Sequence, residues 1–234
     1  SADGFALTVE HQNESKQFHC AMLIVATPAY AAAKLIEPIA PEPAALIADI
    51  PYASIASVPL AYRVDQFAQP PDGFGFLTPR SEGLRTLGSI WNSSLFPGRA
   101  PEGWVLTTNF IGGATDAEAA SLRDDELVRI VHDDLSKALR VRGAPRRLPI
   151  THYERAIPQY VIGHAARITK LEAVLTRLGF NLTPVPDGHL CCGSAGTYSL
   201  TQPVLARQLR DHRLNALESG RPELIVTSNV GCQS

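Results

Sequence analysis

Residues 73–113 read GFGFLTPRSEGLRTLGSIWNSSLFPGRAPEGWVLTTNFIGG, and this stretch decides the fold. It contains three apolar runs, at 73–79, 84–94 and 103–113. Segments rich in glycine, proline and serine separate these runs, as turns separate paired strands. The pattern therefore predicts a set of antiparallel strands.

The sequence before this stretch predicts further strands. Residues 53–65, ASIASVPLAYRVD, are strand-like, although Pro59 weakens the middle because proline cannot donate a ladder hydrogen bond. Residues 4–12 alternate apolar and polar, which is typical of a half-buried strand. Residues 17–26, QFHCAMLIVA, are continuously apolar at their end and predict a buried strand.

Five segments have helical patterns. The clearest is 124–139, with acids in its first turn and one apolar face formed by Leu127, Ile130, Val131, Leu135 and Leu139. We expect its acidic residues Asp124, Asp125, Asp133 and Asp134 to lie on the solvated face. The other helices are predicted over 27–38, with Thr27 as a cap and Pro28 in the first turn, over 41–50, over 164–179 and over 201–219.

These elements define an α+β fold class. We expect a mixed or antiparallel sheet with peripheral helices, followed by a small α/β unit. The last strand of that unit is predicted at PELIVTSN, residues 222–229, and it should be buried.

The amino-acid composition indicates which partners and which location to expect for the protein. The chain has 234 residues, a net charge of −2 and a hydrophobic fraction of 45%, so we expect neither a basic surface nor a nucleic-acid partner. The most apolar stretch, residues 21–36, is too short and too mixed to span a bilayer. We expect a cytoplasmic protein, peripheral to the inner membrane at most, with reduced thiols. Its start at Ser1 is typical of a fragment or a processed product.

Several segments in order resemble one family. They are LIVATPAYAAAKLIEPIAP, IPYASIASVPLAYR, the stretch at 73–113 and RAIPQYVIGH. Together they resemble oxygen-dependent protoporphyrinogen oxidase, a flavoprotein of the amine-oxidase superfamily. The resemblance covers residues 1–170, and it implies the central, substrate-binding region of that enzyme.

The resemblance implies which residues bind the substrate. Phe74 and Leu77 would flank the porphyrinogen rings, Phe110 would approach from a neighbouring strand, and Gly75, like Gly73, would let the backbone come close. Aromatic and aliphatic faces suit a flat apolar macrocycle. Core packing is the alternative role of these side chains.

The resemblance also implies FAD, but the sequence lacks the family's flavin-binding segments. No Gly-x-Gly-x-x-Gly follows a strand and opens a helix, and GFGFLT has Thr78 where the last glycine would stand. We therefore expect no flavin oxidation by this chain alone.

Residues 171–234 resemble a second family. The text HLCCGSAGTYSLTQPVLARQLRDHRLNALESG and the Gly231-Cys232 pair resemble the C-terminal cysteine-rich CCG domain of the glycolate oxidase iron-sulfur subunit. The resemblance implies an iron-sulfur or metal site at Cys191, Cys192 and Cys232, because thiolates are soft ligands for iron. A stable cluster needs another ligand, and His189 is a candidate, although a lone histidine is more often solvated or hydrogen-bonded. We expect Cys20 to be a small core residue.

The chain is thus interpreted as a fusion or chimera, with domains at 1–170 and 171–234. Three functions follow from it. The first is protoporphyrinogen oxidase-like chemistry on a porphyrinogen in haem biosynthesis. The second is electron transfer as an iron-sulfur subunit beside a flavoprotein partner. The third is a catalytically inert fragment that binds a porphyrin or a protein partner.

Overall fold

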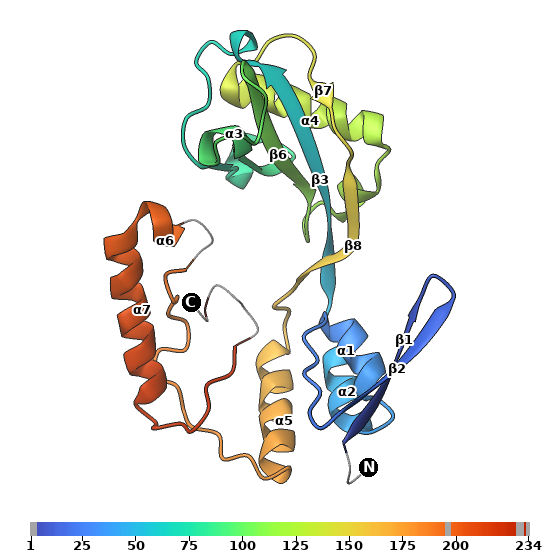
Figure 1. Ribbon diagram of the computed structural model, residues 1–234. Coiled ribbons are helices and arrows are strands. Elements are labelled where there is room, and N and C mark those ends of the chain that lie inside the picture. Colours follow the sequence, from blue (N-terminus) through green and yellow to red (C-terminus); the bar gives the residue numbers. More distant parts are fainter. Residues whose placement is uncertain (1–3, 195–197, 228–231, 233–234) are drawn as a thin grey trace. The chain divides into compact units, whose positions relative to one another are not determined.

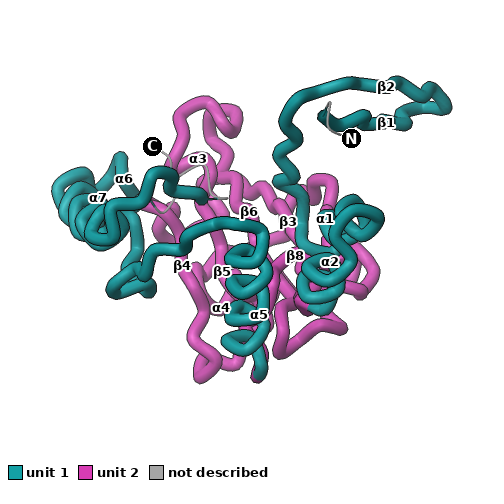
Figure 2. Tube along the Cα trace, turned by 90° about the horizontal axis from the view of Figure 1, so that it is seen from below, with its two compact units in different colours: residues 1–49, 163–234 teal, residues 50–162 magenta. Residues whose placement is uncertain are grey.

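The computed structural model describes residues 4–194, 198–227 and 232, and the chain divides into two compact units. Residues 50–162 form one unit, named here the sheet unit. Residues 1–49 together with 163–234 form the other, named the helical unit (Figure 2). The α+β class predicted from the sequence is confirmed, since the described strand pairs are all antiparallel and helices accompany the sheets.

The sheet unit is built on one antiparallel sheet (Figure 1). Its strands run in the spatial order β4-β5-β6-β3-β7, and β8 also pairs with β3. Their bounds are β3 Tyr52–Arg63, β4 Gly75–Leu77, β5 Thr86–Ile90, β6 Trp104–Gly112, β7 Arg146–Arg147 and β8 Thr151–Pro158. The three strands predicted within 73–113 are β4, β5 and β6, and their antiparallel pairing is confirmed.

Pro59 lies in the middle of β3, a central strand, so the expectation that it weakens this strand is wrong. The register explains why the proline is tolerated. On one side of β3, β8 pairs with residues up to Ser57, and β7 pairs from Leu60 onward. Pro59 falls between these two partners, where no hydrogen bond to its nitrogen is required.

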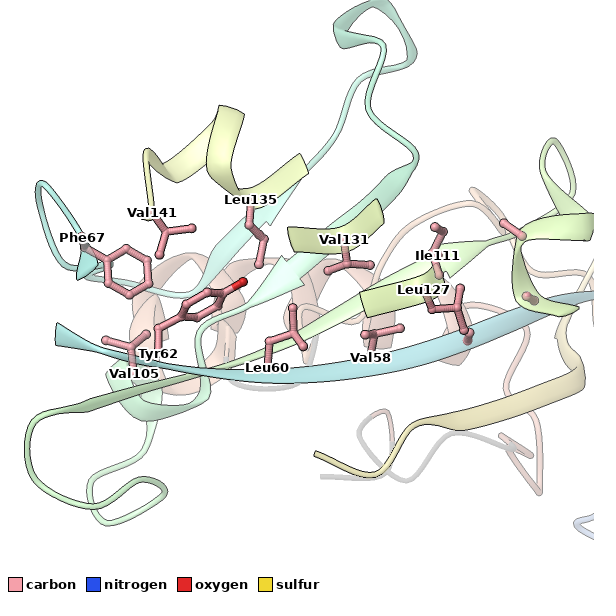
Figure 3. Close-up of a cluster of buried hydrophobic side chains, with 13 residues drawn as sticks. Val58, Leu60, Tyr62, Phe67, Val105, Ile111, Leu127, Val131, Leu135 and Val141 are labelled. Carbon is pink, nitrogen blue, oxygen red and sulfur yellow. The ribbon is translucent and has the colours of Figure 1, made fainter. Parts of the chain in front are cut away.

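Helix α4, Asp124–Leu139, covers one face of this sheet and builds the main core (Figure 3). The helix has the predicted bounds. Leu127, Val131 and Leu135 are fully buried, and they pack with alternate residues of two strands. Those strand residues are Val58, Leu60, Tyr62, Val105 and Ile111. Every second residue of a strand faces the helix, and helix residues spaced by about one turn face the sheet, so the two apolar surfaces pack together.

Asp134 corrects one expectation for α4. Its side chain is buried, whereas we expected it on the solvated face. The carboxylate Oδ2 accepts hydrogen bonds from the backbone N–H of Arg85 at 3.0 Å and of Thr86 at 2.8 Å, and from Thr86 Oγ1 at 2.8 Å. Three donors compensate the loss of water around the charge. Asp134 therefore links α4 to the start of β5 through hydrogen bonds.

Short elements complete the sheet unit. Helix α3, Asn92–Leu95, contacts β6. Three 3₁₀ turns occur at η1 Val64–Gln66, η2 Arg80–Glu82 and η3 Ala117–Ser121.

The helical unit begins with a two-stranded hairpin, β1 Phe5–His11 and β2 Glu14–Cys20. Both predicted strands exist, but their predicted burial is wrong. Most residues of the hairpin are exposed, and residues 21–26 are not in a strand. Met22 and Ile24 are 75% and 81% exposed. Within the part of the chain described here, β1 and β2 pair only with each other, so no neighbouring strand buries this apolar run.

Helices α1, Ala29–Ile36, and α2, Pro41–Ala48, follow as predicted. The capping differs, because Pro28 occupies the N-cap position of α1 and no side chain caps it. Helix α5, His164–Arg177, confirms the predicted helix before Gly179, and it contacts α2. Arg177 forms an ion pair with Glu42, and Arg167 donates to the Asp49 carbonyl at 3.2 Å.

The end of the chain is organised around α7, Pro203–Glu218, which is preceded by α6, Tyr198–Thr201. The last strand predicted is not found among the described residues. Residues 222–227 have no strand structure, and Leu224 and Val226 are 74% and 83% exposed, while 228 and 229 lie outside the described residues. No helix in the described part of the chain is both long and apolar enough to cross a membrane.

Candidate functional site

Three of the four residues expected to bind substrate lie on one face of the sheet unit. The register aligns Leu77 of β4 with Gly88 of β5, and Gly88 with Phe110 of β6. Gly75 lies in the next row, paired with Ile90 and through it with Thr108. Because Ile111 and Val105 point to α4, Phe110 lies on the opposite face. We call this row of Leu77, Gly88 and Phe110 the open-face row.

Gly88 was not singled out in the sequence, yet it sets the shape of the open-face row. A Cβ at this position would lie 2.8 Å from the Phe76 carbonyl oxygen and 3.0 Å from Leu77 Cδ2. Leu77 therefore leans over the glycine, and no side chain rises between Leu77 and Phe110. A glycine in a strand interior is the sequence signal that would have found it.

Exposure of the row fits a binding surface better than a core. Leu77 is 86% exposed, and Phe110 is half-buried. The neighbouring row is partly covered by α3, because Thr108 Oγ1 donates to Asn92 Oδ1 at 2.8 Å.

Phe74 stands apart from the open-face row. It lies one residue before β4 and is 48% exposed, and its carbonyl accepts from the Trp91 N–H at 2.9 Å. Gly75 follows with φ of 143°, and a Cβ there would lie 1.9 Å from the Ser89 carbonyl oxygen. At Gly75 the backbones of β4 and β5 therefore approach each other closely.

Leu77 also borders a pocket of about 280 Å³ at the edge of the sheet. Phe76, Thr78 and Leu84 line it with Glu82 and Lys137. The Thr78 hydroxyl is buried without a hydrogen-bond partner. The edge of the open-face row therefore combines apolar side chains with charged and hydroxyl groups.

The cysteine-rich segment brings two of its three candidate ligands together. The Sγ atoms of Cys192 and Cys232 are 2.9 Å apart, although 40 residues separate them in the chain. Their contact, together with the Ser194 backbone N–H, lowers the pKa of the Cys192 thiol. The same contact raises the pKa of Cys232. One thiol of the pair is thus favoured as the thiolate, since hydrogen bonds stabilise the charged form.

Cys191 lies beside this pair, and its side chain adds to the lowering of the Cys192 pKa. Its Sγ accepts a hydrogen bond from the Gly193 N–H at 3.3 Å, and the side chain is exposed. Among the described residues, no three His, Cys, Asp or Glu side chains gather closely enough to hold a metal ion. His189 is exposed. The donor chemistry suits iron, but the described residues do not assemble a cluster site by themselves.

Cys20 is not the core residue that we expected. It is half-exposed as the last residue of β2. The hairpin is mostly exposed, so no hydrophobic core surrounds Cys20 there.

Gly193 fixes the cysteine turn against α7. Its φ is +78°, and a Cβ would lie 2.4 Å from the Ala206 carbonyl oxygen. The backbone of the turn therefore touches the backbone of the helix. Around this contact, a pocket of about 310 Å³ is lined by both thiols of the pair and by Ser194, Ser199, Arg207 and Arg210. These polar residues were not identified from the sequence.

Sequence comparison defines the class of protein for both parts of the chain. Residues 1–186 match the family of flavin-containing amine oxidoreductases, and residues 163–234 match the cysteine-rich CCG domain. The first match covers most of the chain, so the protein belongs to the flavin-containing amine oxidoreductase family. It carries a cysteine-rich domain fused to that region.

Particular relatives support both assignments. The chain is 33% identical to the chloroplastic protoporphyrinogen oxidase of Oryza sativa over 76% of its own length, and 50% identical to the glycolate oxidase iron-sulfur subunit of Escherichia coli over 47%. It spans 35% of the rice protein and 25% of the bacterial subunit. A crystal structure of a putative protoporphyrinogen oxidase from Exiguobacterium has the same fold, with a TM-score of 0.55 at 21% identity, covering 74% of this chain and 37% of that one.

The flavin implied by the family does not fit the residues present. Among the described elements, no Gly-x-Gly-x-x-Gly turn joins a strand to a helix. Such a turn cradles the pyrophosphate of a dinucleotide at a helix N-terminus. The segment between β2 and α1 contains no glycine at all.

Proposed function

We propose that the sheet unit binds a porphyrinogen-type macrocycle, as the substrate-binding part of a protoporphyrinogen oxidase-like oxidoreductase. The observation that carries this proposal is the open-face row. Leu77 leans over Gly88, and Phe110 lies on the far side of the glycine, so the row offers an apolar surface on which the face of a flat ring can lie. The family match supports the substrate class.

Oxidation of the macrocycle would need the flavin that this family uses. Because the described residues offer no cradle for its pyrophosphate, no redox step is assigned to this chain, and the proposed role is binding and orientation. The third function inferred from the sequence, a fragment that binds a porphyrin without turnover, differs from the first only because it includes no oxidation step.

Titration with protoporphyrin IX, followed by porphyrin fluorescence, tests the proposal. Leu77→Ala and Phe110→Ala should each raise the Kd by about tenfold, because each removes one apolar wall of the row. Phe18→Ala is the matched control, since Phe18 is an exposed aromatic residue of β2, and its Kd should equal that of the unaltered chain.

Either of two results would reject this assignment. One is unchanged affinity in folded Leu77→Ala and Phe110→Ala variants, and the other is no saturable binding by the unaltered chain. Coproporphyrin III should be titrated in parallel, because relatives of the chain include a coproporphyrinogen III oxidase of Bacillus subtilis, 30% identical over 122 residues.

A second candidate function is iron-sulfur electron transfer to or from a flavoprotein partner. Its support is the identity with the glycolate oxidase iron-sulfur subunit and the closeness of Cys192 and Cys232. A cluster on Cys191, Cys192 and Cys232 would require ligands beyond those described. Iron and sulfide assays on anaerobically purified protein decide between the candidates: stoichiometric iron and sulfide would favour this one.

The join between the two halves is proposed at residues 170–171, inside α5. Both family matches include this helix, since they overlap over 163–186.

A further inference from the structure

Two cysteine thiols of the helical unit lie within reach of each other. Cys192 and Cys232 are free cysteines whose Sγ atoms are 2.9 Å apart. The chain between them contains both α6 and α7, so the approach is a tertiary one. The adjacent residues Cys191 and Cys192 are poor candidates for a disulfide with each other, because neighbouring cysteines rarely reach disulfide geometry.

The two sulfur atoms lie closer together than two thiolate ligands of one tetrahedral metal would. Two thiolates on one tetrahedral metal, each about 2.3 Å from it, lie about 3.8 Å apart. Cys192 and Cys232 are closer than that, at 2.9 Å. A metal would also need further ligands, and among the described residues no group of three His, Cys, Asp or Glu side chains is placed to hold one. The pair is thus arranged for sulfur–sulfur bond formation.

The pocket beside the pair gives a small polar oxidant access to both sulfur atoms. Its volume is about 310 Å³, and hydroxyl and guanidinium groups from Ser194, Ser199 and Arg207 line it. Arg210 also lines it but is held by two hydrogen bonds to Asp211, at 2.9 and 2.7 Å. These hydroxyl and guanidinium groups can donate hydrogen bonds to a hydroperoxide that enters the pocket.

We propose that Cys192 and Cys232 form a site of reversible oxidation, which a hydroperoxide converts into an intrachain disulfide. The Cys192 thiol loses its proton, and the thiolate attacks the terminal peroxide oxygen. The O–O bond breaks, and a sulfenic acid forms at Cys192. The proton released by the thiol passes to the departing alkoxide or hydroxide, which leaves as an alcohol, or as water when the oxidant is hydrogen peroxide. The Cys232 sulfur then attacks the Cys192 sulfur, its proton passes to the leaving hydroxide, and water departs. Two thiols are oxidised by two electrons, and the peroxide is reduced.

The structure also assigns the two roles. Cys192 directly precedes Gly193, whose backbone contacts the backbone of α7, so the helix positions Cys192 and we assign it as the nucleophile. Cys232 is exposed and acts as the resolving thiol. This inference does not depend on porphyrin binding, because it concerns residues of the helical unit only.

Peptide mapping of the whole chain tests the proposal. Reduced protein, with its iron content measured, is treated with one equivalent of hydrogen peroxide and digested without reductant. We expect loss of two of the four thiols, a cross-linked peptide pair containing Cys192 and Cys232, and recovery of both thiols with dithiothreitol.

Three serine variants separate the roles. Cys191→Ser is the matched control and should keep the cross-link. Cys192→Ser should abolish it. Cys232→Ser should leave a sulfenic acid at Cys192 that dimedone traps.

The proposal is overturned if the cross-link involves Cys191, if it forms only between chains, or if all four thiols survive treatment. Protein that is isolated with iron on these cysteines would also overturn it. Mapping of the unaltered chain alone decides these points, so the test stands even where a variant does not fold.

Discussion

The glycine of the Cys-Cys-Gly sequence has a backbone that leaves no room for a side chain. Gly193 combines a left-handed φ of +78° with contact to the Ala206 backbone. Gly179, at the end of α5, has a similar φ of +98°, but nothing lies within 4 Å of the position that a Cβ would take there. The two glycines therefore separate the cost of backbone conformation from the cost of a clash.

We expect Gly193→Ala to lower the free energy of unfolding by more than Gly179→Ala does. Both variants carry the left-handed penalty of about 1–2 kcal/mol, and only the first must also push the turn away from α7. The displaced turn should slow formation of the Cys192–Cys232 disulfide. Thermal unfolding and the rate of peroxide-induced cross-linking measure both effects; equal losses in the two variants would contradict the role given to the contact.

His152 makes the stability of the sheet unit depend on pH. Its Nε2 lies 2.9 Å from Asp124 Oδ1, and its Nδ1 lies 2.7 Å from the Ala120 carbonyl oxygen. The hydrogen bond to Asp124, then that to Ala120, raises the pKa of His152. The folded chain therefore holds this proton more tightly than the unfolded chain does.

A raised histidine pKa fixes the sign of the effect. The stabilisation is fully present below the unfolded pKa of about 6.5, and it is lost as pH rises through the higher folded pKa. We expect His152→Gln to be less stable than the unaltered chain at about pH 5.5 and to converge with it at about pH 9. Urea unfolding across this range measures the difference. His212→Gln, exposed on α7, is the control, and a pH-independent gap for His152→Gln would disprove the linkage.

At the scale of elements, α4 is attached to the sheet both by its apolar stripe and by one buried acid. Asp134 supplies the acceptor for two backbone N–H groups at the start of β5. Asp133, one residue earlier, points outward and pairs with Arg129 at 3.7 Å. Adjacent acids on one helix thus have different environments.

We expect Asp134→Ala to lower the free energy of unfolding by about 2–4 kcal/mol, because it leaves buried donors without a partner. Asp133→Ala should change it by less than about 0.5 kcal/mol, as surface ion pairs contribute little. Urea denaturation of both variants makes the comparison. Similar values for the two would mean that the contacts of Asp134 do not hold α4 to β5.

At the scale of the whole molecule, both units expose large apolar side chains. In the helical unit these include Ile24, at 81% exposure, and in the sheet unit Tyr160 and Ile162, at 88% and 106%. Exposed apolar surface of this kind favours association.

We therefore expect concentration-dependent self-association that Ile24→Ser and Ile162→Ser reduce. Light scattering over a concentration series measures it. Lys170→Ser, on the exposed surface of α5, is the control and should scatter like the unaltered chain. Scattering that is the same in all three variants would show that these apolar side chains do not drive association.

The sequence alone determined the features that depend on neighbours along the chain. The stripe of Leu127, Val131 and Leu135 defined α4, and the spacing of apolar runs defined β4, β5 and β6. Both family relationships could be recognised from the sequence for the same reason. The matching segments and the Cys-Cys-Gly sequence are local patterns along the chain.

Tertiary structure alone decided the features that depend on distant partners. Pro59 lies in a central strand because β7 and β8 leave a gap beside it, and Asp134 is buried because β5 offers it donors. Residues 21–26 are exposed because no described strand covers them, and Cys192 lies beside Cys232 although 40 residues separate them in the chain. A periodic pattern states which residues could be buried or paired, whereas burial and pairing themselves require a partner that the local sequence does not contain.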